Sequence, residues 1–222
     1  MLDNSIWKNC CILGIFGLIA GILLSVTYEK TKDKIAESER KIAKKIYFEI
    51  IPVERHDNDI LSDTTDIPEE YLSLLGVKKG KVNLVRKNNQ LVAIIVPVTS
   101  SDGYSGDIKM LVGINVNGTI AATRVLSHKE TLGLGDKLDI SKSDWILGFN
   151  GKSLSNPKPE LWKLKKDGGY FDQFTGATIT PRAVVSQVLN ALVYYEKDKL
   201  RLFEEFSAYN PVIAENILGD KN

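Results

Sequence analysis

An uncharged stretch near the N-terminus constrains this chain more than any other feature of its sequence. No charged residue lies between Lys8 and Glu29, and the segment from Cys10 to Val26 reads CCILGIFGLIAGILLSV. A helix of about 20 such residues, at roughly 1.5 Å each, covers the ~30 Å hydrocarbon core of a bilayer. We therefore predict a transmembrane helix over residues 9–28, preceded by a short N-terminus of residues 1–8.

The alternative is a cleaved signal peptide, which has a shorter apolar region followed by a small-x-small cleavage site. Here the apolar region is followed by SVTYEK, which offers no convincing site, so we expect the helix to be retained. Lysines on both sides leave its orientation open. The positive-inside rule favours a cytoplasmic domain, whereas long domains cross membranes largely regardless of such charges.

The chain as a whole has the composition of a globular protein. Of 222 residues, 43% are hydrophobic and 26% are charged, and the formal net charge is +1. A near-neutral chain is a poor candidate for general nucleic-acid binding, which depends on neutralising phosphates. The only cysteines, Cys10 and Cys11, are adjacent, which excludes a disulfide framework and a thiolate zinc site.

An antiparallel sheet is predicted for the middle of the chain. Residues 28–51 contain no proline or glycine and indicate a charged linker helix, and residues 58–70 indicate a polar loop. Strand-like runs follow, and turn signals at Asn88-Asn89, Asn117-Gly118 and Asn150-Gly151 join them as hairpins. The runs are residues 81–86, 91–98, 111–116, 119–126 and 145–149.

The hydrophobic period becomes helical after Thr180. This residue is a plausible N-cap, and Pro181 suits the first helical position, where a missing N–H costs nothing. We predict a packed helix of about four turns from Pro181, which together with the sheet gives residues 29–222 an α+β fold. The apolar stripe of this helix comprises Val184, Val188, Ala191, Leu192 and Tyr195.

The segment Asp172-Gln173-Phe174-Thr175-Gly176-Ala177-Thr178-Ile179-Thr180, just before this helix, is the chemically distinctive part of the sequence. Free N–H groups and the helix dipole favour an anion at a helix start, so a phosphate can rest beside its threonine hydroxyls. The alternative is a threonine-rich turn with a capping threonine. No Walker-type lysine lies in the loop, which argues against nucleotide hydrolysis of the P-loop kind.

Asp172-x-x-Thr175-Gly176-Ala177-Thr178 resembles the Asp-x-x-(Ser/Thr)-Gly-Ala-Thr signature of proteins that carry covalently bound FMN. Residues 102–108, 127–136 and 142–145, with the single anchor, extend the resemblance over essentially the full length. In these stretches the chain is similar to the G subunit of the Rnf (Rsx) ion-translocating electron transport complex. It departs from that family at Leu132, where proline is usual, and has Thr175 where many members have serine.

The resemblance implies roles for the residues of the site. A flavin transferase moves FMN from FAD onto Thr178 and leaves a phosphoester bond, and Asp172 and Gly176 belong to the sequence that the transferase recognises. The other residues expected to contact FMN are Thr175, Ala177, Thr180, Gly103, Tyr104, Ser105, His128, Glu130, Thr131, Leu132 and Gly133.

Some of the side chains singled out have competing interpretations, and for Asp172 the alternative is a surface turn residue. Tyr104 is either a ring that stacks on the flavin or a packed loop tyrosine. The His128-x-Glu130 spacing also suggests a metal pair, but two ligands without a third are weak support, so we expect no metal site. His56 has no partner in the sequence and is expected at the surface.

The resemblance implies an electron-carrying subunit of an inner-membrane complex, with its main domain on the periplasmic side. FMN carries electrons while the protein sets its position and potential. In that family the complex couples electron transfer between NADH and ferredoxin-type partners to sodium or proton translocation. The alternatives are a tethered assembly subunit with a vestigial flavin site and a stand-alone flavin reductase. No nicotinamide-binding glycine fingerprint follows any predicted strand, which argues against the reductase.

Overall fold

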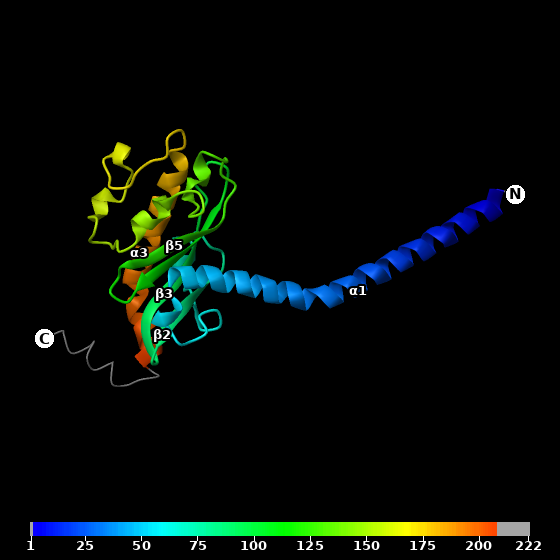
Figure 1. The fold of residues 1–222 in the computed structure, drawn as a ribbon, viewed down its shortest axis with the longest axis horizontal. Coiled ribbons are helices and arrows are strands. Elements are labelled where there is room, and N and C mark those ends of the chain that lie inside the picture. Colours follow the sequence, from blue (N-terminus) through cyan, green and yellow to red (C-terminus); the bar gives the residue numbers. More distant parts are fainter. Residues whose placement is uncertain (1, 208–222) are drawn as a thin grey trace. The chain divides into compact units, whose positions relative to one another are not determined.

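The structure, a computed structural model, describes residues 2–207, and Figure 1 shows its helices and strands in chain order. Met1 and residues 208–222, which belong to the predicted N-terminus and to the end of the predicted domain, lie outside the described residues. The chain divides into two compact units, residues 1–45 and residues 46–222.

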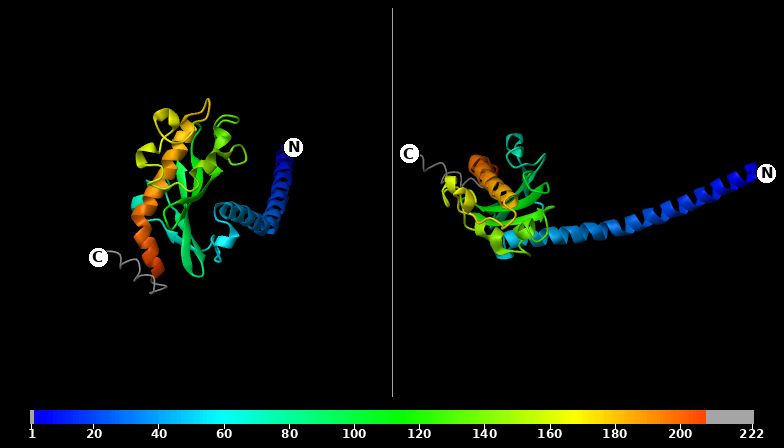
Figure 2. Two further views of the ribbon diagram at one scale, coloured as in Figure 1. Left: turned by 60° about the vertical axis from the view of Figure 1, so that its left-hand side comes forward. Right: turned by 90° about the horizontal axis from the view of Figure 1, so that it is seen from above.

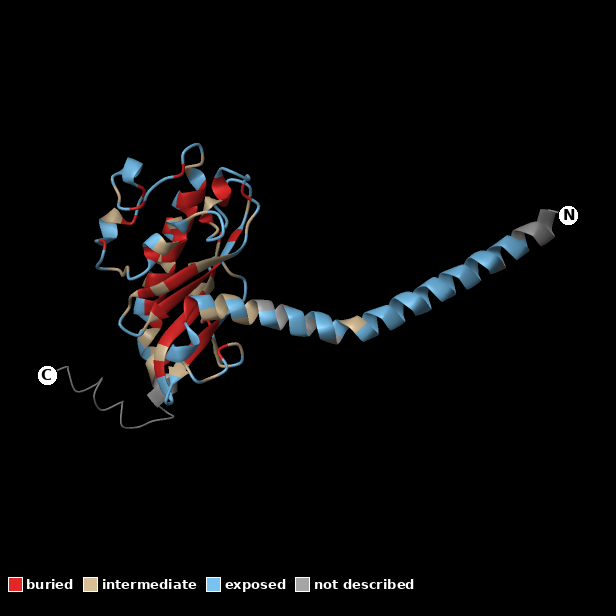
Figure 3. Ribbon diagram, in the orientation of Figure 1, coloured by how far each residue is buried: buried red, intermediate tan, exposed pale blue. Residues whose placement is uncertain are grey.

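A single helix, α1 (Leu2–Ile50), makes up the described part of the first unit and continues into the second. Helical structure is therefore confirmed for the apolar stretch and for the charged stretch that follows it. The part Trp7–Lys32 is long and apolar enough to cross a membrane, and none of it is buried. Its large apolar side chains, such as Phe16 and Leu24, are exposed along the pale blue ribbon of Figure 3.

A five-stranded antiparallel meander forms the centre of the second unit, with the strands paired in the order β1-β2-β3-β4-β5. Four predicted runs, those that begin at residues 81, 91, 111 and 119, are confirmed as strands, each within three residues of its predicted ends. The strands are β1 (Thr64–Asp66), β2 (Lys81–Lys87), β3 (Gln90–Ser100), β4 (Ile108–Asn115) and β5 (Ile120–Ser127).

Two of the three predicted hairpin turns are also confirmed, those at Asn88-Asn89 and Asn117-Gly118. Asn88 and Asn89 have φ values of 51° and 57°, the left-handed conformation that a two-residue turn matched to the strand twist requires. In the next hairpin Gly118 has φ 80°, and the side chain of Asn117 accepts a hydrogen bond from the Thr119 N–H at 3.1 Å.

The run at residues 145–149 was predicted as a strand, and this is wrong. It forms the short 3₁₀ helix η3 (Asp144–Phe149), whose first turn is capped by the Ser143 side chain accepting from the Trp145 N–H at 3.2 Å. The following Asn-Gly turn is present, with φ 73° at Gly151. The Gly151 N–H donates to the Ile120 carbonyl at 2.8 Å, so this turn joins β5 without a strand of its own.

The segment predicted as a polar loop, residues 58–70, contains β1 and the start of α2 (Glu69–Leu72). Thr65 of β1 pairs with Val82, and β-branched threonine suits such an edge position. His56, expected at the surface, is half-buried, with its ring centroid 5.4 Å from that of Phe48. The other short helices are η1 (Val53–Arg55), η2 (Gly135–Leu138), η4 (Pro159–Leu161) and η5 (Lys165–Asp167).

The main hydrophobic core lies between one face of the sheet and the last helix, α3 (Ile179–Ser207), which Figure 2 shows crossing that face. The predicted stripe from Val184 to Tyr195 is buried there against β3 and β4. At 29 residues, however, α3 is about twice as long as predicted, and it begins two residues before Pro181.

The end of α1 covers the opposite face of the sheet. Ile50 and Ile51 pack with Ile95 and Leu111 in a second, smaller core. Gly113 of β4 makes room for this contact, because a Cβ atom there would lie 2.3 Å from Cγ2 of Ile50. The last turn of a helix predicted as a linker is therefore part of the folded second unit.

Candidate functional site

A pocket of about 510 Å³ lies among three segments that are far apart in the sequence. They are the loop between β3 and β4, the segment that follows β5, and the turn that leads into α3. This volume lies within the roughly 300–1,000 Å³ typical of small-molecule sites. The pocket is lined by Tyr104, Glu130, Thr131, Leu134, Gly135, Gly176, Ala177, Thr178, Ile179 and Thr180.

Thr178 stands at the N-terminal end of α3 and is half-buried. Its carbonyl accepts the backbone N–H of Arg182 at 3.4 Å, so Thr178 occupies the position just before the first helical residue. Its hydroxyl lies 3.5 Å from Nζ of Lys166. The unpaired N–H groups of the first helical turn, with the helix dipole, make this end of α3 favourable for an anion.

A tight turn presents Thr178 at the pocket. The Ala177 N–H donates to the Phe174 carbonyl at 3.2 Å, and Gly176 inside the turn has φ 82°. That left-handed conformation favours glycine, which explains the residue type at this position. Thr175 is exposed in the same turn and does not line the pocket.

Thr180 was predicted as the N-cap of the helix, and this is wrong. It lies inside α3, fully buried, and its hydroxyl donates to Oε2 of Glu130. The helix starts earlier, at Ile179, because the Thr178 carbonyl already accepts an intrahelical hydrogen bond.

Glu130 lines the pocket, and its carboxylate accepts hydrogen bonds from two other segments of the site. The residue is 5% exposed, and the second oxygen of its carboxylate accepts the Ser105 N–H at 3.0 Å. Gly103 and Gly135 leave the space for it, since a Cβ atom at either residue would approach the carboxylate to 2.9 Å. A buried carboxylate with donors from two other segments holds those segments in place.

His128 contacts the backbone of Glu130 but does not line the pocket. Its Nδ1 accepts the Glu130 backbone N–H at 3.1 Å, and its Nε2 lies 3.1 Å from Oδ2 of Asp139. Nδ1 therefore carries no proton and Nε2 is the donor, so the ring orients the Glu130 backbone. Among residues 2–207 no group of three histidine, cysteine or acidic side chains is placed to hold a metal ion.

The rim of the pocket is apolar and exposed. Tyr104 lines it with 69% of its surface in solvent. Four residues that were also predicted to contact FMN do not line the pocket: Gly103, Ser105, Leu132 and Gly133. Leu134 and Ile179 also line the pocket but were not predicted as site residues. Leu134 belongs to a stretch that carries the family resemblance, whereas only the three-dimensional fold brings Lys166 to the site.

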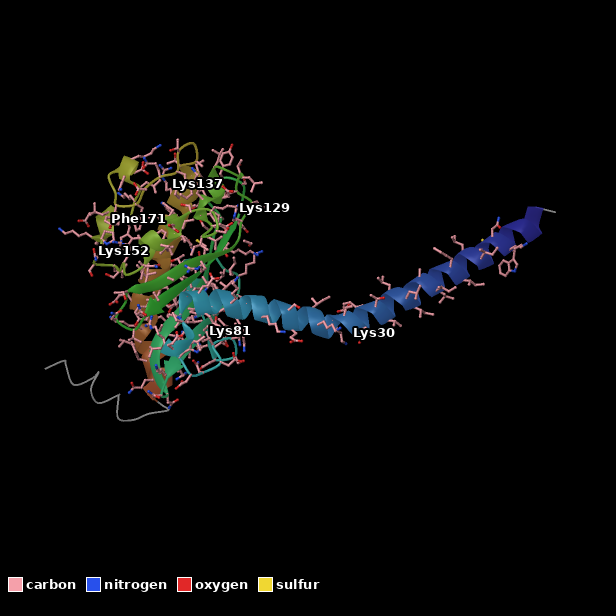
Figure 4. All side chains as sticks on the ribbon, in the orientation of Figure 1. Lys30, Lys81, Lys129, Lys137, Lys152 and Phe171 are labelled. Carbon is pink, nitrogen blue, oxygen red and sulfur yellow. The ribbon has the colours of Figure 1, made fainter. Side chains whose placement is uncertain are left out.

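Asp172 lies outside this pocket, next to a neighbouring hollow of about 470 Å³ that Trp145 and Tyr170 also line. It is exposed, its carboxylate is 2.7 Å from Nζ of Lys165, and its carbonyl accepts the indole N–H of Trp145 at 2.8 Å. On the flank where Figure 4 labels Lys152 and Phe171, Lys152 donates to the hydroxyl of Tyr170 at 2.8 Å, which lowers the pKa of that phenol.

Comparison with known proteins gives two family matches. Residues 103–193 match the FMN-binding domain family, and residues 1–50 match the RnfG N-terminal region. The chain is 43% identical over 203 residues to the G subunit of the ion-translocating oxidoreductase complex of Vibrio atlanticus, which covers 91% of this chain and 96% of the relative. It is 41% identical over 200 residues to the same subunit of Pseudomonas aeruginosa, covering 90% and 92% of the two chains.

Proposed function

Because this chain belongs to the G-subunit family of ion-translocating oxidoreductase complexes, we propose that it is an electron-carrying flavoprotein subunit with FMN covalently attached to Thr178. The cofactor, when bound, supplies the redox chemistry. The chain itself supplies the attachment point, the pocket and the membrane anchor. It works as a redox subunit within the complex and not as a stand-alone enzyme.

The observation that carries this proposal is the position of the Thr178 hydroxyl. It lies at the start of a 29-residue helix and at the edge of a pocket of about 510 Å³. A phosphate esterified to it would meet the N–H groups of the first turn of α3. The apolar rings and chains of Tyr104, Leu134 and Ile179 suit a flat aromatic group, so the residues present fit FMN.

Attachment needs no catalytic base in this chain, because a flavin transferase forms the bond. The Thr178 oxygen replaces the adenylate group on the FMN phosphorus of FAD, so the threonine loses its proton and AMP leaves. Asp172, the first residue of the motif, is exposed on the surface, where a transferase can reach it. We assign Asp172 and Gly176 to recognition by that enzyme.

In the complex, the FMN-loaded chain would take part in electron transfer between NADH and ferredoxin-type partners, coupled to the translocation of sodium ions or protons. The Trp7–Lys32 part of α1 anchors the chain in the inner membrane, with the domain on the periplasmic side. A covalent cofactor on an anchored carrier cannot diffuse away, and the anchor raises its effective concentration near the other redox centres.

Mass spectrometry of the chain co-expressed with a flavin transferase tests the proposal. The denatured protein should gain one FMN less one water, located on a peptide that contains Thr178. An unmodified mass under these conditions would support the alternative of a tethered assembly subunit with a vestigial site. FMN that is bound but lost on denaturation would instead favour a flavin reductase with a dissociable cofactor.

A further inference from the structure

We propose that Lys166 is the cation that holds the phosphate of the FMN attached to Thr178. The assignment rests on the function proposed above, because a phosphate stands here only when Thr178 carries the cofactor. Lys166 lies on η5, twelve residues before Thr178 and outside the attachment motif.

Lys166 contacts the hydroxyl that becomes esterified. Its Nζ lies 3.5 Å from Oγ1 of Thr178, which is at the outer limit of a hydrogen bond, and its side chain is otherwise exposed. A contact this long to a neutral hydroxyl contributes little. Once phosphorus is bonded to Oγ1, charged oxygens stand beside the same ammonium, and charge-assisted hydrogen bonds are shorter and stronger than neutral ones.

The neighbouring cations are already paired with carboxylates. Nζ of Lys165 is 2.7 Å from Asp172, and the guanidinium of Arg182 is 2.8 Å from Asp167. Within residues 2–207, Lys166 has no carboxylate at ion-pair distance. The positive charge at the attachment hydroxyl is therefore uncompensated until an anion arrives.

The charges also match in number. The phosphate that joins threonine to FMN is a diester with a single negative charge. One ammonium group and the partial positive charge at the start of α3 together compensate it. We therefore expect Lys166 to order the attached cofactor without affecting the unloaded fold.

Four forms of the full chain, co-expressed with a flavin transferase and purified in detergent, test this assignment. They are the unmodified chain, Lys166→Met, Thr178→Val and the double variant, each with its FMN content measured by mass spectrometry. Thermal unfolding is followed by the fluorescence of the buried tryptophan Trp162 and its neighbours. The fluorescence anisotropy of the attached flavin is measured in the two forms that retain Thr178.

Lys166→Met should lower the unfolding midpoint by about 1–3 °C when FMN is attached and by less than about 0.5 °C in the Thr178→Val background. It should also lower the flavin anisotropy, and about 1 M salt should bring the unmodified chain towards the same value, because salt screens an exposed ion pair. Lys166→Arg should restore both readouts. Lys163→Met, at an exposed lysine three residues earlier on the same segment, is the matched control and should change neither.

Equal midpoint losses with and without Thr178 would overturn the assignment, because they would give Lys166 a purely structural role. Unchanged anisotropy in fully loaded Lys166→Met would overturn it as well, and both results leave the proposed function standing. Absence of the FMN mass from the unmodified chain would overturn the proposed function together with this inference.

Discussion

The buried carboxylate of Glu130 accepts a hydrogen bond from the hydroxyl of Thr180, fifty residues further along the chain. Its other oxygen accepts the backbone N–H of Ser105 at 3.0 Å, twenty-five residues earlier. These two bonds fix the first turn of α3 against the loop that carries Tyr104. The shape of the pocket therefore depends on a carboxylate whose own donors come from two distant segments.

Thr180→Val should lower the free energy of unfolding by about 1–3 kcal/mol, because it leaves one oxygen of a buried carboxylate without its donor. Urea denaturation followed by tryptophan fluorescence measures the loss. Thr180→Ser keeps the hydroxyl and should retain most of the stability. A valine variant as stable as the unmodified chain, beside a less stable serine variant, would show that the methyl group and not the hydroxyl is the stabilising feature.

Thr178→Val should abolish covalent flavin while leaving the fold intact. Valine keeps the β-branched shape and deletes the atom that forms the phosphoester. The flavin fluorescence band on a denaturing gel and the mass of the intact chain provide the measurement. Thr175→Ser, at an exposed position of the same turn, should retain the band, as should Thr180→Val. A band that survives in Thr178→Val and disappears in Thr180→Val would move the attachment site to Thr180.

Sequence reasoning located the elements whose signals are local. The turn at Asn88 and Asn89 needs only two adjacent residues that accept left-handed conformations, and the strands beside it are short apolar runs rich in valine and isoleucine. The pocket could be predicted only through its motif. Its outline follows from resemblance to a family, whereas the residues alone favoured a threonine-rich turn without a ligand.

What sequence reasoning missed depends on contacts between distant residues. Thr180 looks like a cap because it precedes Pro181, and only the approach of Glu130 shows that its hydroxyl is used elsewhere. The apolar run from Trp145 to Phe149 has the composition of a strand. In the structure this run is a 3₁₀ helix and not a strand. The centroid of the Trp145 ring lies 5.3 Å from that of Phe149 and 4.9 Å from that of Phe174, and the second contact links the run to a residue far along the chain.

Gly113→Ala should destabilise the domain by about 1–3 kcal/mol, because its Cβ would lie 2.3 Å from Cγ2 of Ile50. This methyl group branches from the Cβ atom of Ile50 and has little freedom to move aside. Urea denaturation provides the measurement. Gly148→Ala, where an added Cβ meets nothing within 4 Å, is the matched control and should stay within about 0.5 kcal/mol.

A second substitution identifies the contact responsible. Ile50→Leu keeps the volume of the side chain but removes the branch at Cβ, so it should recover part of the loss when combined with Gly113→Ala. Strictly additive losses in the double variant would show that Ile50 is not what limits space at Gly113.

The proposed topology predicts a cytoplasmic N-terminus and a periplasmic domain from about Lys30 onward. A fluorescent protein that matures only in the cytoplasm should be dark when fused after Asn222 and bright when fused before Met1. The lysines that follow the apolar stretch oppose this orientation, but they are interleaved with acidic residues and precede a long domain, so they have little weight. Bright fluorescence from the C-terminal fusion would reverse the placement.

Alkaline unfolding should report on Tyr195. This residue is 2% exposed and its hydroxyl donates to the Val116 carbonyl at 2.7 Å, and burial raises its pKa to about 12 from an ordinary 10.0. At a pH between these two pKa values, Tyr195 has lost its phenolic proton in the unfolded chain and retains it in the folded chain. The stabilisation is therefore complete below pH 10 and is lost as the pH rises towards 12, at about 1.4 kcal/mol per pH unit for this one group.

Tyr195→Phe should consequently reduce the fall in the free energy of unfolding between pH 10 and pH 12 by about 2–3 kcal/mol. At pH 7 the same variant should be less stable than the unmodified chain by about 1 kcal/mol, because the hydrogen bond to Val116 is lost. Urea denaturation at a series of pH values measures both effects. Tyr104→Phe, whose ring is mostly in solvent, should follow the unmodified chain throughout. A Tyr195→Phe curve parallel to that of the unmodified chain would show that Tyr195 ionises equally in the folded and unfolded states.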